Sequence, residues 1–136
     1  MKLSIVIVSY NTKQLLRECL EAIFASKLAD DYEVLVIDNA SSDDSAQMLS
    51  QEFPTVKLIN NKVNLGFAKA HNQAIEFTEH RATSRGDDET AVLVTNPDIV
   101  LEPNCVEELV AALMRHPEAA GAGPKLLRLK KEENPD

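Results

Sequence analysis

Ala91-Val92-Leu93-Val94-Thr95-Asn96-Pro97-Asp98 is the stretch of sequence that decides the fold. Its apolar start predicts a buried strand, and the turn that follows carries an amide and a carboxylate. The same order occurs earlier, where Val34-Leu35-Val36-Ile37 leads into Asp38-Asn39. Open α/β sheets bind their ligands beyond the carboxyl ends of the strands. The two turns therefore predict one shared crevice, with one acid for a ligand's sugar or base and the other for a metal.

Strands and helices alternate along the whole chain. Runs rich in β-branched residues predict strands, and apolar residues at helical spacing predict helices. The expected strands are residues 3–8, 33–37, 56–59 and 91–94, and the expected helices are residues 13–24, 43–49, 67–77 and 104–115. This βαβαβαβα order predicts the α/β class, with an open, mostly parallel, twisted sheet and helices on both faces.

Local signals refine these boundaries. Thr12 is the predicted N-cap of the first helix, and Ser41 or Ser42 that of the second, with Asp43 and Asp44 in its first turn. The polar residues 80–88 predict an exposed loop, and residues 119–127 a fifth strand at the edge of the sheet.

Composition limits the class of protein. The 136 residues suit one domain, which we place at residues 1–127, followed by a charged, disordered tail at 128–136. A net charge of -8 argues against a nucleic-acid partner. There is neither a long apolar segment nor a signal-peptide pattern, which predicts a cytoplasmic protein. Cys19 and Cys105 lack metal-ligand spacing and are expected to be reduced thiols.

Four groups of residues are candidates for binding a ligand at the carboxyl edge. Asp38 could accept a hydrogen bond from a nucleobase or a ribose, and a role as a turn residue is equally compatible with its position. Asp98, with help from Asn96, could bind Mg²⁺ or Mn²⁺, although Pro-Asp turns are common. Tyr10 could stack on a planar base, or it could simply cover the edge of the sheet.

The fourth group is Asn64-Leu65-Gly66-Phe67-Ala68-Lys69-Ala70-His71-Asn72, where a glycine, a helix start and Lys69 could face a diphosphate. Without the other motifs, a helix with a solvated lysine would be the simpler interpretation. His71, His80 and His116 share no metal-ligand spacing, so each is expected at a surface or a helix end. The sequence lacks the dinucleotide-binding glycine motif, the P-loop and the G-x-S-x-G elbow of hydrolases.

In order and spacing, these motifs resemble the family 2 glycosyltransferases, most closely their rhamnosyltransferase-like branch. The resemblance covers residues 3 to about 127 and rests on residues 5–11, 36–43, 64–68 and 96–98. It implies a GT-A fold, a UDP- or dTDP-linked sugar donor, inversion at the anomeric carbon, and a glycan or lipid-linked acceptor in cell-envelope polysaccharide synthesis. It also implies a location in the cytoplasm, peripheral at the inner face of the membrane.

The resemblance also implies roles for individual residues. Ser9, Tyr10 and Asn11 would line the base and ribose pocket, and Asp38 resembles the acid that reads the nucleobase. Asn64, Gly66 and Lys69 would lie near the donor. Asp98 resembles the last acid of the Asp-x-Asp motif, which contacts the Mg²⁺ or Mn²⁺ on the diphosphate. Asn96 stands at the first position of that motif, which removes one charge from the site.

In this family the general base and the acceptor pocket follow the stretch that matches residues 120–127. We therefore name no catalytic base and expect the chain to be the donor-binding part of a transferase, with apolar surface that favours a homodimer. A non-catalytic nucleotide-sugar-binding module shares the same residues and stays open. A phospho-acceptor signalling domain fits less well, because the first strand ends in Ser9-Tyr10-Asn11 rather than in paired acids.

Overall fold

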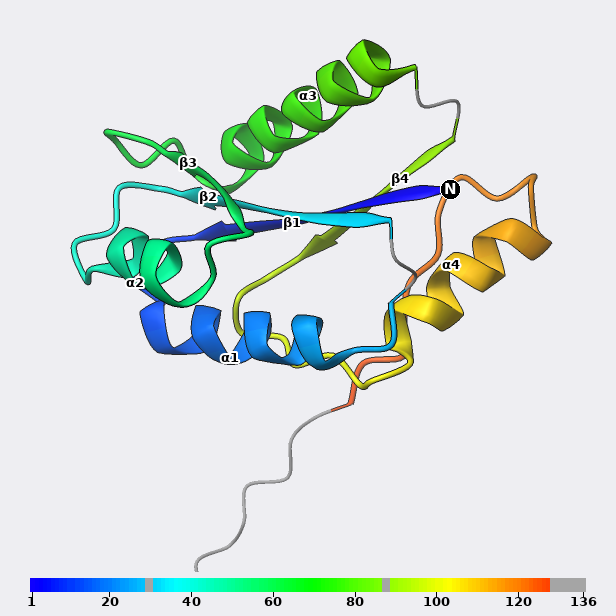
Figure 1. Cartoon of the computed structure of the whole chain (residues 1–136), viewed down its shortest axis with the longest axis horizontal. Coiled ribbons are helices and arrows are strands. Elements are labelled where there is room, and N and C mark those ends of the chain that lie inside the picture. Colours follow the sequence, from blue (N-terminus) through cyan, green and yellow to red (C-terminus); the bar gives the residue numbers. More distant parts are fainter. Residues whose placement is uncertain (29–30, 87–88, 128–136) are drawn as a thin grey trace, which may run out of the picture.

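The computed structural model describes residues 1–28, 31–86 and 89–127, and in them four parallel strands form one sheet between two layers of helices (Figure 1). The elements are β1 (Lys2–Ser9), α1 (Lys13–Ala25), β2 (Tyr32–Asp38), α2 (Ser45–Glu52), β3 (Lys57–Asn60), α3 (Phe67–Arg85), β4 (Thr90–Thr95) and α4 (Cys105–Arg115). The α/β class, the parallel sheet and the alternating order are thus confirmed. The expected tail at residues 128–136 lies outside the described residues.

The core is divided between the two faces of the sheet. On one face, Ile5, Ile7 and Val36 pack against the apolar stripes of α1, α2 and α4. On the other face, Val6, Leu35 and Ile37 pack against Ala70 and Ala74 of α3. The strands alternate between these two cores because successive side chains point to opposite faces. Figure 1 shows α3 alone on one side of the sheet and α1, α2 and α4 on the other.

The strand order β3-β2-β1-β4 determines where a ligand can bind. From β1 the chain winds outward through β2 to β3, and it then returns through α3 to place β4 on the other side of β1. The winding direction therefore reverses between β1 and β4. In sheets of this type the connections on either side of such a reversal diverge, which leaves a crevice at the carboxyl ends of the strands.

The predicted start of the first helix is confirmed in position, and that of the second is wrong. α1 begins at Lys13 after Thr12, but the Thr12 hydroxyl makes no capping bond and pairs with the Ser9 hydroxyl at 2.8 Å. α2 begins at Ser45 after Asp44, which has a left-handed backbone, so neither Ser41 nor Ser42 is the N-cap. Acids are absent from the first turn of α2, because the chain is still turning at Asp43 and Asp44.

Two further expectations are wrong. α3 continues through residues 80–85, where a loop was expected, and ends at Arg85, with Gly86 as the C-cap at a φ of 71°. The hydroxyls of Thr83 and Ser84 satisfy carbonyls one turn back, so this polar stretch is an exposed helix. Residues 119–127 are exposed and belong to no strand of the described sheet. Glycine and proline in that stretch disfavour a strand.

The C-terminal half of α3 is held to the sheet by a cluster around Glu33 of β2. The Glu33 carboxylate pairs with Lys57 of β3 and lies 3.6 Å from Arg81 and 3.8 Å from Arg85. It also accepts a 3.0 Å hydrogen bond from the Ser4 hydroxyl. Burial alone would raise the pKa of Glu33, but the bonds from Lys57 and Ser4 and the basic charges lower it. These contacts explain why the helix extends to Arg85.

We expect Glu33→Gln to reduce the free energy of unfolding at neutral pH by about 1 to 2 kcal/mol, because charged hydrogen bonds are lost. A folded-state pKa below the unfolded value gives stability that is present above the unfolded pKa of about 4.3 and is lost as pH falls through the folded pKa. Urea unfolding from pH 7 to pH 3 should therefore bring the wild type and the variant together in acid. A constant difference at every pH would contradict this account, and Glu76→Gln, on an exposed position of α3, is the control.

Candidate functional site

The candidate site is the edge of the sheet at the carboxyl ends of β1, β2 and β4, where sheets of this type have their ligand crevice. Ser9 at the end of β1 lies beside Asp38 at the end of β2 in the parallel register. On the other side of β1, Ile7 pairs with Thr95, the last residue of β4, so the turn at residues 96–98 begins at the same edge. The structure thus brings the three predicted strand ends together at the point where the winding reverses.

Asp38 is the buried acid of the site, with only 1 % of its surface exposed. Its Oδ2 accepts a 3.0 Å hydrogen bond from the backbone N–H of Ser41, which accounts for its role as a turn residue. Its Oδ1 is buried and has no hydrogen-bond partner among the described residues. A buried carboxylate oxygen without a donor is costly, so it is ready to accept a hydrogen bond from a ligand or a water molecule.

Asn39 was missed by the sequence analysis as a functional position, and it organises the crevice. Its side chain is buried and accepts hydrogen bonds from the Leu65 N–H at 3.0 Å and from the Asn61 amide at 3.2 Å. It also donates to the Gly66 carbonyl at 3.2 Å. Asn39 therefore ties the end of β2 to the loop after β3 and to the start of α3. An asparagine directly after a strand is the only signal in the sequence.

The residues predicted to line the base and ribose pocket lie at this edge, and they differ in exposure and in hydrogen bonding. Ser9 is buried, and its hydroxyl is engaged by Thr12. Tyr10 is 50 % exposed, so its ring is open to a ligand. Asn11 has a left-handed backbone, and its Oδ1 accepts a 2.8 Å bond from the Ser42 N–H. Asn11 thus joins the β1–α1 turn to the β2–α2 turn.

Asp43 is a second organiser that the sequence analysis assigned differently. Its Oδ2 accepts a 2.9 Å hydrogen bond from the backbone N–H of Lys13, and its Oδ1 accepts the N–H and hydroxyl of Ser45. Burial alone would raise the pKa of Asp43, but these hydrogen bonds outweigh it and lower the pKa. One carboxylate therefore caps the first turns of both α1 and α2, and it fixes the two turns that flank Tyr10 and Asp38.

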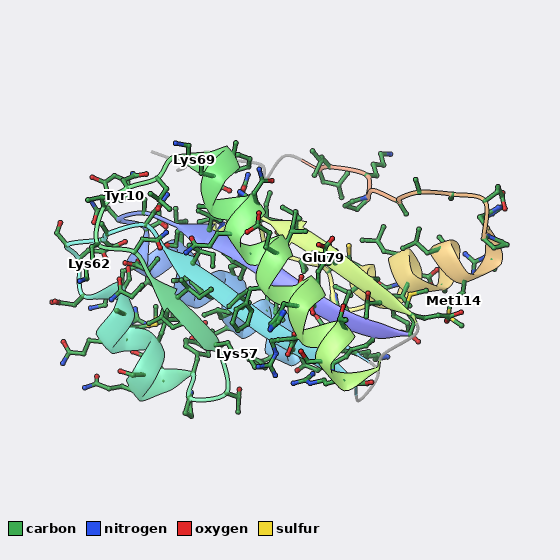
Figure 2. The ribbon with its side chains drawn as sticks, turned by 90° about the horizontal axis from the view of Figure 1, so that it is seen from above. Tyr10, Lys57, Lys62, Lys69, Glu79 and Met114 are labelled. Atoms are coloured by element: carbon green, nitrogen blue, oxygen red, sulfur yellow. The ribbon has the colours of Figure 1, made fainter. Side chains whose placement is uncertain are left out.

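The Asn64, Gly66 and Lys69 group lies at the start of α3. Asn64 Oδ1 accepts a 2.8 Å hydrogen bond from the Gly66 N–H, and Gly66 has a φ of 79°, which a residue with a Cβ adopts only with strain. Lys69 is exposed. Figure 2 shows Tyr10, Lys62 and Lys69 at the same end of the molecule, far from Met114. Two lysines therefore accompany the acids at this edge.

Asn96 and Asp98 form a turn after β4 that rests on α1. The Asn96 carbonyl accepts the Ile99 N–H at 3.3 Å and lies 3.7 Å from the Cys19 sulfur. Burial raises the pKa of the Cys19 thiol to about 11, and the negative charge of Asp98 adds to this effect. Cys19 therefore stays a neutral thiol and a hydrogen-bond donor beneath the turn, while the side chains of Asn96 and Asp98 are exposed.

The side-chain oxygens at this turn suit a cation that also has ligands outside the protein. Across the described ranges, no group of three or more His, Cys, Asp and Glu side chains is arranged to hold a metal ion. Asp98 offers one exposed carboxylate and Asn96 one exposed amide. Mg²⁺ is commonly held by one or two carboxylates together with substrate phosphates and water. The residues therefore fit a divalent cation that a diphosphate ligand helps to hold.

His71 differs from the expected surface histidine. It lies in α3, is 6 % exposed, and its ring stands 4.0 Å from the ring of Phe67. His80 and His116 are exposed, as expected. Both cysteines are free thiols, also as expected. None of the described helices is long and apolar enough to cross a membrane.

The fold is similar to that of two solved structures. The chain superposes on the crystal structure of S. aureus TarS in complex with UDP-GlcNAc with a TM-score of 0.70 and 21 % identity, covering 85 % of this chain and 32 % of that chain. It also superposes on the mannosyltransferase PcManGT from Pyrobaculum calidifontis in complex with GDP-Man and Mn²⁺. There the TM-score is 0.66 at 22 % identity, covering 82 % of this chain and 32 % of that chain. These likenesses support the GT-A fold.

Sequence comparison gives the family. The chain is 34 % identical over 93 residues to the N-acetylglucosaminyl-diphospho-decaprenol L-rhamnosyltransferase of Mycobacterium tuberculosis, which covers 67 % of this chain and 30 % of that protein. The chain thus spans about a third of the length of this relative. The model of the family described as glycosyl transferase family 2 matches residues 4–128. The chain belongs to glycosyl transferase family 2, and its similarity to a rhamnosyltransferase agrees with the resemblance read from its motifs.

Proposed function

We propose that this chain is the donor-binding part of an inverting glycosyltransferase that uses a UDP- or dTDP-linked sugar and a glycan or lipid-linked acceptor. The observation that carries the proposal is the buried Asp38, whose Oδ1 has no partner among the described residues at the strand edge. Asp38 ends β2, which is the neighbour of β1 on one side. The exposed Asp98 follows β4, which is the neighbour of β1 on the other side. In this arrangement Asp38 can accept a hydrogen bond from the base of a nucleotide sugar, and Asp98 can hold a cation that binds its diphosphate.

Each residue of the crevice then has a role in binding. Asp38 accepts a hydrogen bond from the nucleobase, Tyr10 stacks on the base, and Ser9 and Asn11 hold the turn that carries Tyr10. Asn64 and Gly66 shape the start of α3, and Lys69 faces the diphosphate. Asp98, assisted by Asn96, holds Mg²⁺ or Mn²⁺. When bound, the cation neutralises the negative charge that develops on the departing nucleoside diphosphate. Deprotonation of the acceptor hydroxyl is assigned to no residue of this chain.

The direct test is calorimetric titration of the purified chain with UDP and with dTDP, each with and without Mn²⁺. We expect one of the two nucleotides to bind, and to bind more tightly with Mn²⁺. A folded chain that binds neither nucleotide in either condition would overturn the proposal. The difference between the two titrations identifies the nucleobase and the sugar ring that fit the crevice.

The alternative is a module of residues 1–127 that binds a nucleotide sugar without turning it over. It shares the fold and the binding residues of the enzyme and differs only in turnover. Measuring release of free sugar from UDP- and dTDP-linked donors discriminates between the two. Hydrolysis or transfer by the chain supports the enzyme, and tight donor binding without either supports the module.

We also propose a homodimer that forms at the exposed edge of β4. Val92 and Val94 are 39 % and 46 % exposed on the side of α3, and a groove of about 800 Å³ runs along the other side of β4, next to α4. The six residues of β4 carry no charge, unlike the protected edges of most sheets. Antiparallel pairing of two β4 strands centred on Leu93 would set Val92 of each copy opposite Val94 of the other.

Light scattering at high protein concentration should report a dimer. Val94→Lys should convert it to a monomer, because two lysines would be buried near the two-fold axis, whereas Val63→Lys, at a 63 % exposed loop residue, should leave it dimeric. A wild-type monomer at every concentration would refute the dimer.

For the location of the protein, we propose the cytoplasm, at the inner face of the membrane, where the protein would meet a lipid-linked acceptor.

A further inference from the structure

His71 carries a polar atom that the described structure leaves without a hydrogen bond. Nδ1 of His71 lies 2.9 Å from the Phe67 carbonyl oxygen, one helical turn back. Nε2 is buried and has no partner among the described residues. Asp38 Oδ1 is the other acceptor atom in this condition. Arg81 Nε is also without a hydrogen bond, but it lies 3.6 Å from the Glu33 carboxylate. Since buried polar atoms are normally paired, His71 Nε2 and Asp38 Oδ1 are each open to a hydrogen bond from a ligand or a water molecule.

The bond to Phe67 determines what His71 can offer. A carbonyl oxygen only accepts, so Nδ1 must carry the hydrogen in this contact. In the neutral ring, Nε2 then holds a lone pair and accepts a hydrogen bond. A ligand group that meets Nε2 must therefore be a donor, such as a hydroxyl.

The side of α3 on which His71 lies follows from its neighbours. Ala70 and Ala74 face the sheet, where they pack on Val6 of β1 and on β2. Gln73 is hydrogen-bonded to Asn61, directly after β3. Thr78 follows His71 by seven residues, almost two full turns, and lines a small pocket with Thr90 and Val92 of β4. His71 thus faces away from β3, toward β1 and β4.

The height of the ring along α3 places it at the carboxyl edge. Helical side chains lean toward the N-terminus of their helix, and the His71 ring packs against Phe67, the first residue of α3. The chain just before this turn is tied to the end of β2 by the bonds from Asn39 to Leu65 and Gly66. The imidazole therefore lies above the end of β1, between the strand that bears Asp38 and the strand that leads to Asp98.

We propose that Nε2 of His71 accepts a hydrogen bond from a ribose hydroxyl of the donor nucleotide. This rests on the proposed function, in which the base is read at Asp38 and the diphosphate is held at Asp98. The ribose joins base and diphosphate covalently, so it must cross the end of β1, which lies between β2 and β4. The Phe67 ring is 64 % exposed beside the imidazole, so it is free to turn aside as the ribose enters.

The test combines variants of the protein with variants of the ligand. Loss of one buried hydrogen bond weakens binding by about 5- to 10-fold, so His71→Phe should weaken UDP binding by that factor. It should also remove most of the preference of the wild type for UDP over 2′,3′-dideoxy-UDP, since the hydroxyl would have no acceptor. His71→Gln, whose amide oxygen can accept, should restore part of both. His80→Phe, at an exposed histidine of the same helix, is the matched control and should bind as the wild type does.

A measurement on the wild type keeps the inference testable if the variants fold poorly. In long-range ¹H–¹⁵N spectra, UDP should shift the Nε2 resonance of His71, and 2′,3′-dideoxy-UDP should not. If both ligands give the same response, or if His71→Phe keeps the preference for UDP, the ribose contact is wrong and the proposed function stands. If the wild type binds neither UDP nor dTDP, the proposed function fails and this inference fails with it. If it binds dTDP alone, the same comparison is made with dTDP and 2′,3′-dideoxythymidine diphosphate.

Discussion

Asp98→Ala should abolish the metal-dependent part of UDP binding and lower the affinity measured with Mn²⁺ by about 100-fold or more. Loss of an outer-shell partner of a metal ligand typically costs about 10- to 100-fold in metal affinity, so loss of the coordinating carboxylate itself should cost at least as much. In the described residues, Asp98 belongs to no group of three or more His, Cys, Asp and Glu side chains that could hold the ion without it. Because Asn96 is neutral, Asp98 supplies the full protein charge of this turn.

The fold should survive this change, because Asp98 is exposed and no hydrogen bond of its side chain is recorded in the described structure. Titration with UDP in the presence and absence of Mn²⁺ gives the metal contribution as a difference, so a general loss of affinity is recognised separately. Glu102→Ala removes an exposed acid four residues further along the chain and is the matched control. Equal Mn²⁺ dependence in Asp98→Ala and the wild type would move the cation away from this turn.

The sheet could be predicted because its signals are local and agree with one another. β1, β2 and β4 are runs of β-branched and apolar residues, and each is separated from the next by a helical pattern. Right-handed crossovers then bring the carboxyl ends of the strands to one edge. Asp38 and Asp98 reach that edge as a consequence of the strand ends, so their approach to one crevice followed from the sequence.

The parts that could not be predicted depend on contacts between distant residues. Polar residues after Phe77 read as a loop, yet Arg81 and Arg85 find Glu33 on β2 and extend α3. Asp43 reads as part of its own helix, yet it caps α1 through the Lys13 N–H. His71 was expected at a surface or a helix end, and it lies in the second turn of α3 but is buried. A helical pattern shows on which face of the helix a histidine lies, but the burial of the histidine depends on which residues pack beside it.

Asn39→Ala is expected to lower the free energy of unfolding by about 3 kcal/mol, the largest stability change among the crevice residues. The side chain makes three hydrogen bonds to the loop between β3 and α3, and each buried partner that is left unpaired costs about 1 to 3 kcal/mol. Relaxation of the loop at residues 61–66 toward water recovers part of this cost. The same relaxation would displace the start of α3, so UDP binding should weaken together with stability.

Urea unfolding measures the effect, because a shift in midpoint at constant slope reports stability alone. Asn104→Ala is the matched control, since Asn104 stands at the N-cap of α4 without a side-chain capping bond and its loss should cost little.

Asn39→Asp adds a sharper comparison. It keeps the acceptor for the Leu65 N–H but loses the donor to the Gly66 carbonyl, and it buries a second carboxylate beside Asp38. Like charges and burial both favour the protonated acid, so this variant should regain stability relative to the wild type as pH falls. A stability cost of Asn39→Ala no greater than that of Asn104→Ala would show that the network of Asn39 does not hold the crevice together.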